Sequence, residues 1–363
     1  MNESIIFIGP YPPPLDGNSL PLFNLHRDIS LNYKTDFVNL SKSEGLEKKS
    51  MFFRFLFFLK KFIYLNNNQK KYSILYFSIA ESFLGNLRDI VIYFLCRKRL
   101  NSSIVHMLGG NNMKNILRPR ISLQYYINKY FLKQVGAIIV EGEIQKKFFA
   151  NVTDSSKIHI IPNFAEDTLF LSESIIFSKF KSFNKINILF LSNLLYGKGH
   201  IELINAFECL DSKLQNKIIL NFAGEAVYKK EEFLETVKKY DNIIYHGFAN
   251  MEVKQKLFAD AHIFCLPTYY PYEGQPFTII EAFASACCVL TTNHSGISYI
   301  FQDKINGIEV EKKSVESLLN ALQFLIINTD MIEKFGISNY KEAVKKYTYD
   351  IYLKKVEKIL TLV

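Results

Sequence analysis

The chain has 363 residues, of which 48% are hydrophobic and 22% charged, a composition that excludes a disordered or low-complexity protein. Its length favours two domains, each with its own core. The formal net charge of +9 is unevenly distributed. Residues 1–165 carry 22 Lys and Arg against 11 Asp and Glu, a net of +11, and the remainder carries 22 against 24, a net of −2. The basic excess therefore belongs to the first half.

Targeting and redox features indicate a cytoplasmic protein. Residues 1–9 lack the basic start of a secretory signal and have the pattern of a first β-strand. No apolar run approaches the ~18–20 residues that span a bilayer. The cysteines are odd in number and show no metal-binding spacing, which favours a reduced compartment. They are Cys96, Cys209, Cys265, Cys287 and Cys288.

Short apolar runs alternate with amphipathic segments along the chain, as βα units do. The predicted strands of the first half are Ser4–Ile8, Ser73–Phe77, Ile104–Met107, Ala137–Glu141 and Ile158–Ile161. Those of the second half are Ile188–Leu191, Ile218–Ala223, Ile243–His246, Ile263–Pro267 and Cys288–Thr292. Patterning is weakest around Glu166–Lys185, where we expect an interdomain linker. Residues 339–363 are expected to be helical.

The basic excess is densest in residues 48–71, where lysines flank a run of phenylalanines. Such a segment is typical of an interfacial helix on an anionic membrane. The alternative is an ordinary core helix with a basic polar edge. The charge alone would also fit RNA, but no nucleic-acid-binding module is recognisable, and no nucleic-acid partner is expected.

Glu273 and Glu281 lie on either side of a predicted helix start, in the stretch Tyr-Glu-Gly-Gln-Pro-Phe-Thr-Ile-Ile-Glu-Ala. The free N–H groups and the dipole of a helix N-terminus suit a diphosphate. Carboxylates repel phosphate, so these two suit neutral hydroxyl groups on either side of it. Taken separately, they could equally be a solvated loop glutamate and a helix-dipole glutamate.

The pattern Glu-Gly-x-Pro-x-x-x-x-Glu-Ala resembles the signature of the retaining GT-B glycosyltransferases of family 4. Further segments resemble that family's landmarks, in its order, across nearly all of the chain. They are residues 9–19, 105–110, 160–163, 189–194, the triplet Gly197-Lys198-Gly199, and residues 222–225 and 246–248. The resemblance implies an α/β fold of GT-B type, two Rossmann-like parallel-sheet domains facing across a cleft. It implies an N-terminal acceptor domain at 1–165, a nucleotide-sugar domain at 186–338, and a helical segment at 339–363 that crosses back.

The resemblance also implies roles for individual residues. Lys198 would neutralise the departing diphosphate, Glu273 would face the donor sugar and Glu281 the ribose, and His106 would lie beside the sugar ring. Further donor-binding positions are Gly17, Asn193, Gly274 and the backbone N–H groups of Phe277 and Thr278, and Asp16 and Asn18 are candidate acceptor contacts. Several positions depart from the family. Asn193 stands where an Arg is usual, Asp16 and Phe164 each replace a glycine, Ser295 takes the place of one glycine of a pair, and Tyr299 stands where an acid is common.

The implied reaction is front-face transfer of a sugar with retention, without a metal or other cofactor, since no Asp-x-Asp pattern follows a predicted strand. The implied donor is a nucleotide diphosphate sugar, most simply a UDP-sugar. The implied acceptor is a lipid-linked glycan of surface polysaccharide such as capsule or O-antigen, reached at the inner face of the cytoplasmic membrane. Two alternatives stay open: a nucleotide-sugar epimerase of the same fold, and a catalytically silent homologue that binds nucleotide or glycan.

Overall fold

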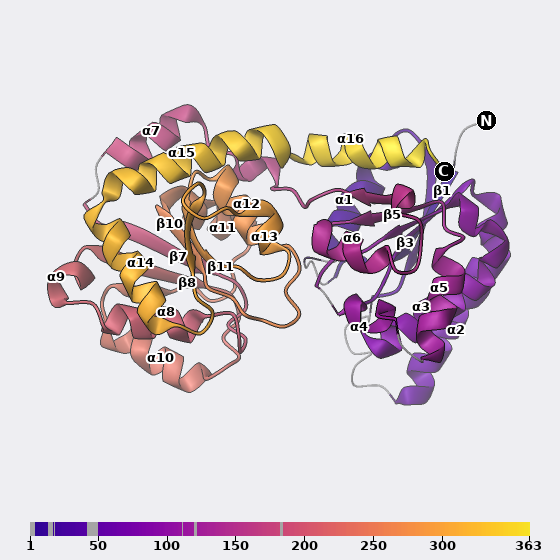
Figure 1. Cartoon of the computed structure of the whole chain (residues 1–363), viewed down its shortest axis with the longest axis horizontal. Coiled ribbons are helices and arrows are strands. Elements are labelled where there is room, and N and C mark those ends of the chain that lie inside the picture. Colours follow the sequence, from indigo (N-terminus) through magenta and orange to yellow (C-terminus); the bar gives the residue numbers. More distant parts are fainter. Residues whose placement is uncertain are drawn as a thin grey trace. The chain divides into compact units, whose positions relative to one another are not determined.

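The computed structural model describes residues 4–13, 17, 19–41, 50–110, 112–119, 122–181 and 184–363. It divides into two compact units (Figure 1). The first contains Met1–Pro162 and Tyr352–Val363, and the second contains Asn163–Ile351. Each unit is built on a six-stranded, wholly parallel sheet, which confirms the α/β class predicted from the sequence.

The first sheet has the order β2-β1-β3-β4-β5-β6. Its strands are β1 (Ser4–Gly9), β2 (Lys34–Asn39), β3 (Ile74–Ser78), β4 (Ser103–His106), β5 (Ala137–Val140) and β6 (Ile158–Ile160). The central strands β1, β3, β4 and β5 are buried on both faces, which explains their uninterrupted apolar runs. β2 is an edge strand with mostly polar, half-exposed residues, and for that reason the sequence pattern did not predict it.

Helices connect these strands. They are α1 (Ser19–Ile29), α2 (Met51–Asn68), η2 (Gln69–Lys71), α3 (Phe83–Leu95), η3 (Arg97–Ser102), α4 (Met113–Leu117), α5 (Leu123–Leu132), α6 (Glu143–Phe149) and η4 (Ser155–Lys157). α3 packs between α2 and α5, and the three lie together in Figure 1. The basic-aromatic segment is thus a helix over Met51–Asn68, whereas Lys48 and Lys49 fall outside the described residues.

The second sheet has the order β12-β11-β10-β7-β8-β9. Its strands are β7 (Ile186–Leu191), β8 (Ile218–Ala223), β9 (Ile243–Tyr245), β10 (Ile263–Leu266), β11 (Cys288–Thr292) and β12 (Gly307–Val310). The sequence pattern did not predict β12, which is again an edge strand. The helices are η5 (Asp167–Leu169), α7 (Glu173–Lys181), α8 (His200–Glu208), α9 (Ser212–Gln215), α10 (Lys230–Lys239), α11 (Met251–Asp260), α12 (Phe277–Ala284), α13 (Ile297–Ile300), α14 (Val315–Ile327) and α15 (Thr329–Lys346). The last helix, α16 (Tyr349–Leu360), begins in this unit and ends in the first.

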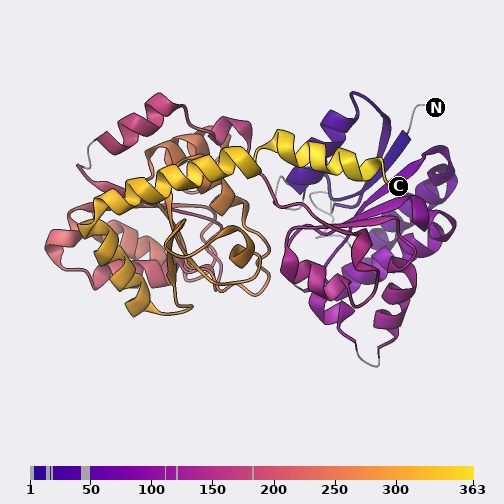
Figure 2. The ribbon, with the colours of Figure 1, turned by 45° about the horizontal axis from the view of Figure 1, so that its top comes forward.

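The segment expected to be a linker, Glu166–Lys185, differs from that expectation. It contains η5 and α7, and Ile176 and Phe180 of α7 pack into the core of the second unit. The weak sequence pattern reflects short elements with few buried positions. At the other end of the chain, Tyr352–Val363 groups with the first unit, where the yellow α16 ends in Figures 1 and 2.

Candidate functional site

The carboxyl edge of the second sheet carries the loop that holds Lys198. Gly197 and Gly199 both have positive φ angles, 89° and 92°. A Cβ atom at Gly199 would lie 2.6 Å from the carbonyl oxygen of Pro267, which follows β10, so only glycine permits this approach. The tight turn brings Lys198, in the loop between β7 and α8, against the loop that follows β10.

Lys198 and Glu273 form an ion pair in this place. The Lys198 Nζ atom lies 3.0 Å from Oε1 and 2.8 Å from Oε2 of Glu273. The hydroxyl group of Thr268 also donates to Glu273 Oε2, at 2.8 Å, and Tyr270 presents its ring 4.8 Å from the ammonium group. The side chains of Lys198 and Glu273 are only 12% and 8% exposed. The two residues to which the resemblance assigns donor contacts therefore neutralise each other in the structure.

The loop between Glu273 and α12 is fixed from two sides. Gly296 N–H donates to the Gly274 carbonyl at 3.1 Å, and the Ser295 hydroxyl donates to the Glu273 carbonyl. On the other side, Asn163 N–H donates to the side-chain oxygen of Gln275 at 2.6 Å, and the Asn163 amide donates to the Gln275 carbonyl at 2.9 Å. These bonds hold the backbone at the start of α12.

α12 begins at Phe277 with Pro276 as its N-cap, and no side chain caps it. In the described part of the chain, no hydrogen bond engages the N–H groups of Phe277 and Thr278. Unpaired donors at a helix start, together with the helix dipole, form an anion-binding position. The arrangement can accept a phosphate group.

Glu281 lies one turn further along α12 and is 1% exposed. Its Oε1 atom is paired with Lys254 of α11, a residue that the sequence analysis did not single out. Among the described residues, its Oε2 atom is buried and has no hydrogen-bond partner. A buried carboxylate with one oxygen held by a lysine and the other unpaired is suited to accept a ligand hydroxyl group.

Asn193 follows β7 and is exposed. Its side-chain oxygen accepts the backbone N–H of Glu225 at 3.1 Å, which joins the loops after β7 and β8. Its predicted role toward a donor stays a prediction. In the first unit, Gly17 is an exposed turn residue, and the candidate acceptor residues Asp16 and Asn18 lie outside the described residues.

His106 is the last residue of β4 in the first unit and is fully buried. Its Nδ1 atom lies 2.8 Å from the Tyr76 hydroxyl group, and its Nε2 atom has no hydrogen-bond partner among the described residues. Burial lowers the pKa of His106 to about 3, so the ring is neutral at pH 7. Its surroundings are those of a core histidine, and its role beside a sugar stays a prediction.

A buried carboxyl group, that of Glu141, and a partly buried one, that of Glu81, hold the loop that follows His106. Glu141 accepts the N–H of Gly109 at 3.0 Å, and Glu81 accepts the N–H of Asn112 at 2.9 Å. Burial raises the pKa of Glu81 to about 7, although these backbone bonds oppose the shift. Sequence reasoning missed Glu81 because it follows a strand end without any motif around it.

The structure brings together Lys198, Glu273, Gly274, Phe277, Thr278 and Glu281 in the second unit, while Gly17 and His106 belong to the first. The described residues hold no cluster of three His, Cys, Asp or Glu side chains that could bind a metal ion. Within the same residues, no helix has the length and apolarity that a membrane span requires. The expected independence of metal stays a prediction.

Comparisons with known proteins concern the family and the fold of the chain and not its individual site residues. Residues 172–342 match the family model described as Glycosyl transferases group 1. An N-acetylgalactosamine-N,N'-diacetylbacillosaminyl-diphospho-undecaprenol 4-alpha-N-acetylgalactosaminyltransferase of Campylobacter jejuni is 30% identical over 168 residues, 44% of this chain and 42% of the relative. An uncharacterized glycosyltransferase of Methanocaldococcus jannaschii is 25% identical over 165 residues, 45% of this chain and 41% of the relative. The matched segments thus span under half the length of these two relatives.

Among solved structures, Anabaena HepE in complex with UDP aligns with a TM-score of 0.73 at 14% identity, covering 99% of this chain and 100% of HepE. A sucrose-phosphate synthase of Thermosynechococcus elongatus aligns with a TM-score of 0.74 at 14% identity, covering 98% of each chain. At such identity the likeness concerns the fold, which is GT-B. The second unit of this chain therefore carries a domain of the Glycosyl transferases group 1 family, on a GT-B fold.

Proposed function

We propose that the protein is a retaining glycosyltransferase that moves a hexose-type sugar from a UDP-sugar to a lipid-linked glycan. The observation that carries the proposal is the Lys198–Glu273 ion pair beside the open start of α12. It places a cation, two free backbone donors and a hydroxyl acceptor at the carboxyl edge of a parallel sheet, where nucleotides bind in such folds. The group 1 family match supports the assignment to sugar transfer.

Each group has a part in the proposed donor complex. The N–H groups of Phe277 and Thr278 bind the diphosphate, and Lys198 turns from Glu273 to the phosphate oxygens. Glu273, released from Lys198, accepts hydrogen bonds from the donor sugar. Glu281 accepts a ribose hydroxyl through its free Oε2 atom, while Lys254 holds the other oxygen.

The proposed reaction has no protein nucleophile. The acceptor hydroxyl attacks the anomeric carbon on the face that the leaving group departs from, and the departing phosphate takes up the proton. The bond from the anomeric carbon to the diphosphate breaks, and nucleoside diphosphate is the second product. Lys198 and the start of α12 stabilise the charge that develops on the phosphate, and we propose that this suffices without a metal ion.

The choice of UDP draws on the HepE structures, which contain UDP and, in one case, UDP-glucose. The choice of a lipid-linked acceptor draws on the printed activity of the Campylobacter relative, which acts on a diphospho-undecaprenol substrate. With such an acceptor, the protein acts in the assembly of a surface polysaccharide such as capsule or O-antigen. Residues 48–71, with exposed Lys60 beside the apolar residues of α2, support an anionic membrane partner, at the inner face of the cytoplasmic membrane.

The test is nucleotide release from a panel of UDP-sugars, with and without lipid-linked oligosaccharides extracted from bacterial membranes. We expect release that depends on the acceptor, persists in a metal chelator, and is lost in Lys198→Met. The matched control is Lys229→Met, which removes an exposed lysine of the same unit. Isomerised nucleotide sugar without acceptor would favour the epimerase, and neither product with any donor would favour the silent homologue.

A further inference from the structure

Helix α3 exposes a stripe of large apolar side chains that nothing in the described structure covers. Along α3 the exposed positions recur every three or four residues, so they lie on one helix face. They are Leu84, Leu87, Val91 and Phe94, at 75%, 41%, 41% and 55% exposure. Single exposed apolar residues are ordinary on a protein surface, but a contiguous stripe marks a binding surface.

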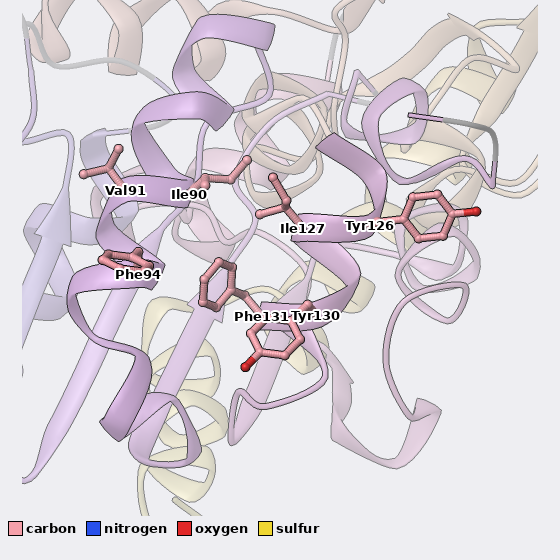
Figure 3. Close-up of a pocket in the computed structure, with 7 residues that line it drawn as sticks. All are labelled: Ile90, Val91, Phe94, Tyr126, Ile127, Tyr130 and Phe131. Carbon is pink, nitrogen blue, oxygen red and sulfur yellow. The ribbon is translucent and has the colours of Figure 1, made fainter. Parts of the chain in front are cut away.

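Helix α5, which packs against α3, repeats the pattern. Its exposed residues Leu123, Tyr126 and Tyr130 are again three and four residues apart. Between the two helices runs a groove of about 560 Å³ lined by Ile90, Val91, Phe94, Tyr126, Ile127, Tyr130 and Phe131. Figure 3 shows Ile90, Ile127 and Phe131 between the helices, with Val91 and Tyr126 at the two outer edges. The lining is aliphatic or aromatic throughout.

The charges around this groove are of one sign. The acid of α3, Asp89, is buried and paired with Arg88 at 2.9 Å, and α5 contains no acid. Three basic residues follow the C-terminal ends of the two helices. Arg97 stacks on Phe94, with its guanidinium carbon 4.4 Å from the ring centroid, and Lys98 and Lys133 are exposed. An apolar face with a basic rim is complementary to an anionic lipid surface.

We propose that α3 and α5 form a docking surface for an anionic lipid bilayer, and that the groove between them takes up a lipid hydrocarbon chain. Tyr126 and Tyr130 provide the rings with polar tips that favour the membrane–water boundary. A second copy of the chain fits less well, because two-fold pairing would bring the basic rims of both copies together. The inference goes beyond the transfer reaction, since it assigns a surface of the first unit remote in sequence from the donor-binding loops.

The chain contains no tryptophan, which allows a direct test in the full-length protein. Phe94→Trp would place a single fluorophore on the stripe, and Phe248→Trp would place one at an 81% exposed position of the second unit as the matched control. With vesicles of phosphatidylcholine and phosphatidylglycerol, the Phe94→Trp emission should shift to the blue. Brominated acyl chains should quench it, and the control should change in neither respect.

Vesicle co-flotation measures the energetic contributions. Leu84→Ser combined with Phe94→Ser should weaken binding at least about tenfold, since each side chain loses its apolar burial in lipid. Lys98→Gln and Lys133→Gln should each weaken it about fivefold at low salt. Phe177→Ser, at a 71% exposed site of the second unit, is the matched control and should float like wild type.

Several results would overturn the inference. Equal flotation of the stripe variant and wild type would do so, as would equal binding to vesicles of phosphatidylcholine alone. Loss of binding on Lys60→Gln, with the α3 variants unaffected, would assign the membrane contact to α2 instead. A dimer in light scattering that Phe94→Ser dissociates would assign the stripe to self-association. None of these assays needs donor, acceptor or turnover, so failure here leaves the proposed transfer reaction untouched.

Discussion

Replacing Glu273 by glutamine should separate the two tasks of the Lys198–Glu273 pair. Glutamine keeps the shape of the side chain and can still accept from Thr268, but it no longer neutralises Lys198. At 2.8 Å and an effective dielectric of about 20, the gross Coulomb attraction is about 6 kcal/mol, an upper bound. Leaving one member of a buried pair without its partner costs about 3–5 kcal/mol.

Because both side chains retain some exposure, we take the lower end of that range. Glu273→Gln should therefore lower the free energy of unfolding by about 3 kcal/mol, which for a unit of this size is roughly 6–12 °C in Tm. The matched control is Glu232→Gln, which breaks the exposed Lys229–Glu232 pair of the same unit and should leave Tm unchanged.

UDP should then reveal the function of the pair. In wild type, the diphosphate competes with Glu273 for Lys198; in Glu273→Gln, the lysine is already free. A charge-assisted hydrogen bond of about 1.5–3 kcal/mol is gained without that competition, so UDP should bind about tenfold tighter or more to the variant. Transfer from the UDP-sugar should fall nevertheless, because the sugar hydroxyls lose a carboxylate acceptor.

The assay is thermal unfolding and UDP titration of wild type, Glu273→Gln and Glu232→Gln side by side. If Glu273→Gln loses stability but binds UDP no better than wild type, the diphosphate does not compete with Glu273 for Lys198. In that case the ion pair would serve only to join the loops after β7 and β10.

Further predictions concern Lys254 and two titratable groups of the first unit, His106 and Glu81. Lys254→Met should weaken UDP binding about tenfold in calorimetry, because Glu281 loses the partner that orients it; an unchanged Kd would remove Lys254 from the site. Burial lowers the pKa of His106 from 6.5 to about 3. As the pH falls below 6.5, the imidazole is protonated in the unfolded chain but not in the folded one, and the folded state loses stability. Between pH 6.5 and 3, the free energy of unfolding of wild type should therefore fall by about 1.4 kcal/mol per pH unit more than that of His106→Gln, as measured by denaturant unfolding. Equal pH dependences of the two proteins would contradict this. Burial raises the pKa of Glu81 to about 7, so its folded carboxyl binds a proton first and adds stability as the pH falls from 7 to 4.5. Glu81→Gln lacks this gain, so its free energy of unfolding should decrease more steeply than that of wild type as the pH falls from 7 to 4.5. A shallower decrease in the variant would mean that the pKa of Glu81 is lowered in the folded state.

The sequence was sufficient for the architecture because buried parallel strands are nearly continuous apolar runs, and β1, β3 and β10 are of this kind. It failed at β2 and β12, whose edge positions leave them short of apolar residues. It also failed at α7, where a short helix with few buried positions resembles a linker.

For the candidate site, the motifs identified Lys198, Glu273 and Glu281 but not what each contacts. Lys198 and Glu273 are 75 residues apart, and no local pattern predicts that they pair. Lys254 has the same local surroundings in the sequence as Lys256, and only the packing of α11 against the second sheet distinguishes them. The α3 stripe was missed for a related reason. An apolar helix pattern predicts a buried helix, and only the structure shows that no other described element packs on this face of α3.

The central claim is that the α12 loop binds a nucleoside diphosphate through Glu281 and the adjacent backbone. The most direct measurement is thermal stabilisation of the full chain by UDP, GDP, ADP and TDP, for wild type, Glu281→Ala and Glu281→Gln. At about 100 times its Kd, a ligand stabilises by about 2.7 kcal/mol, a readily measured shift in Tm. We expect a shift with UDP in preference to the others, abolished or strongly reduced in both variants. No shift with any nucleotide, or an equal shift in the Glu281 variants, would contradict it.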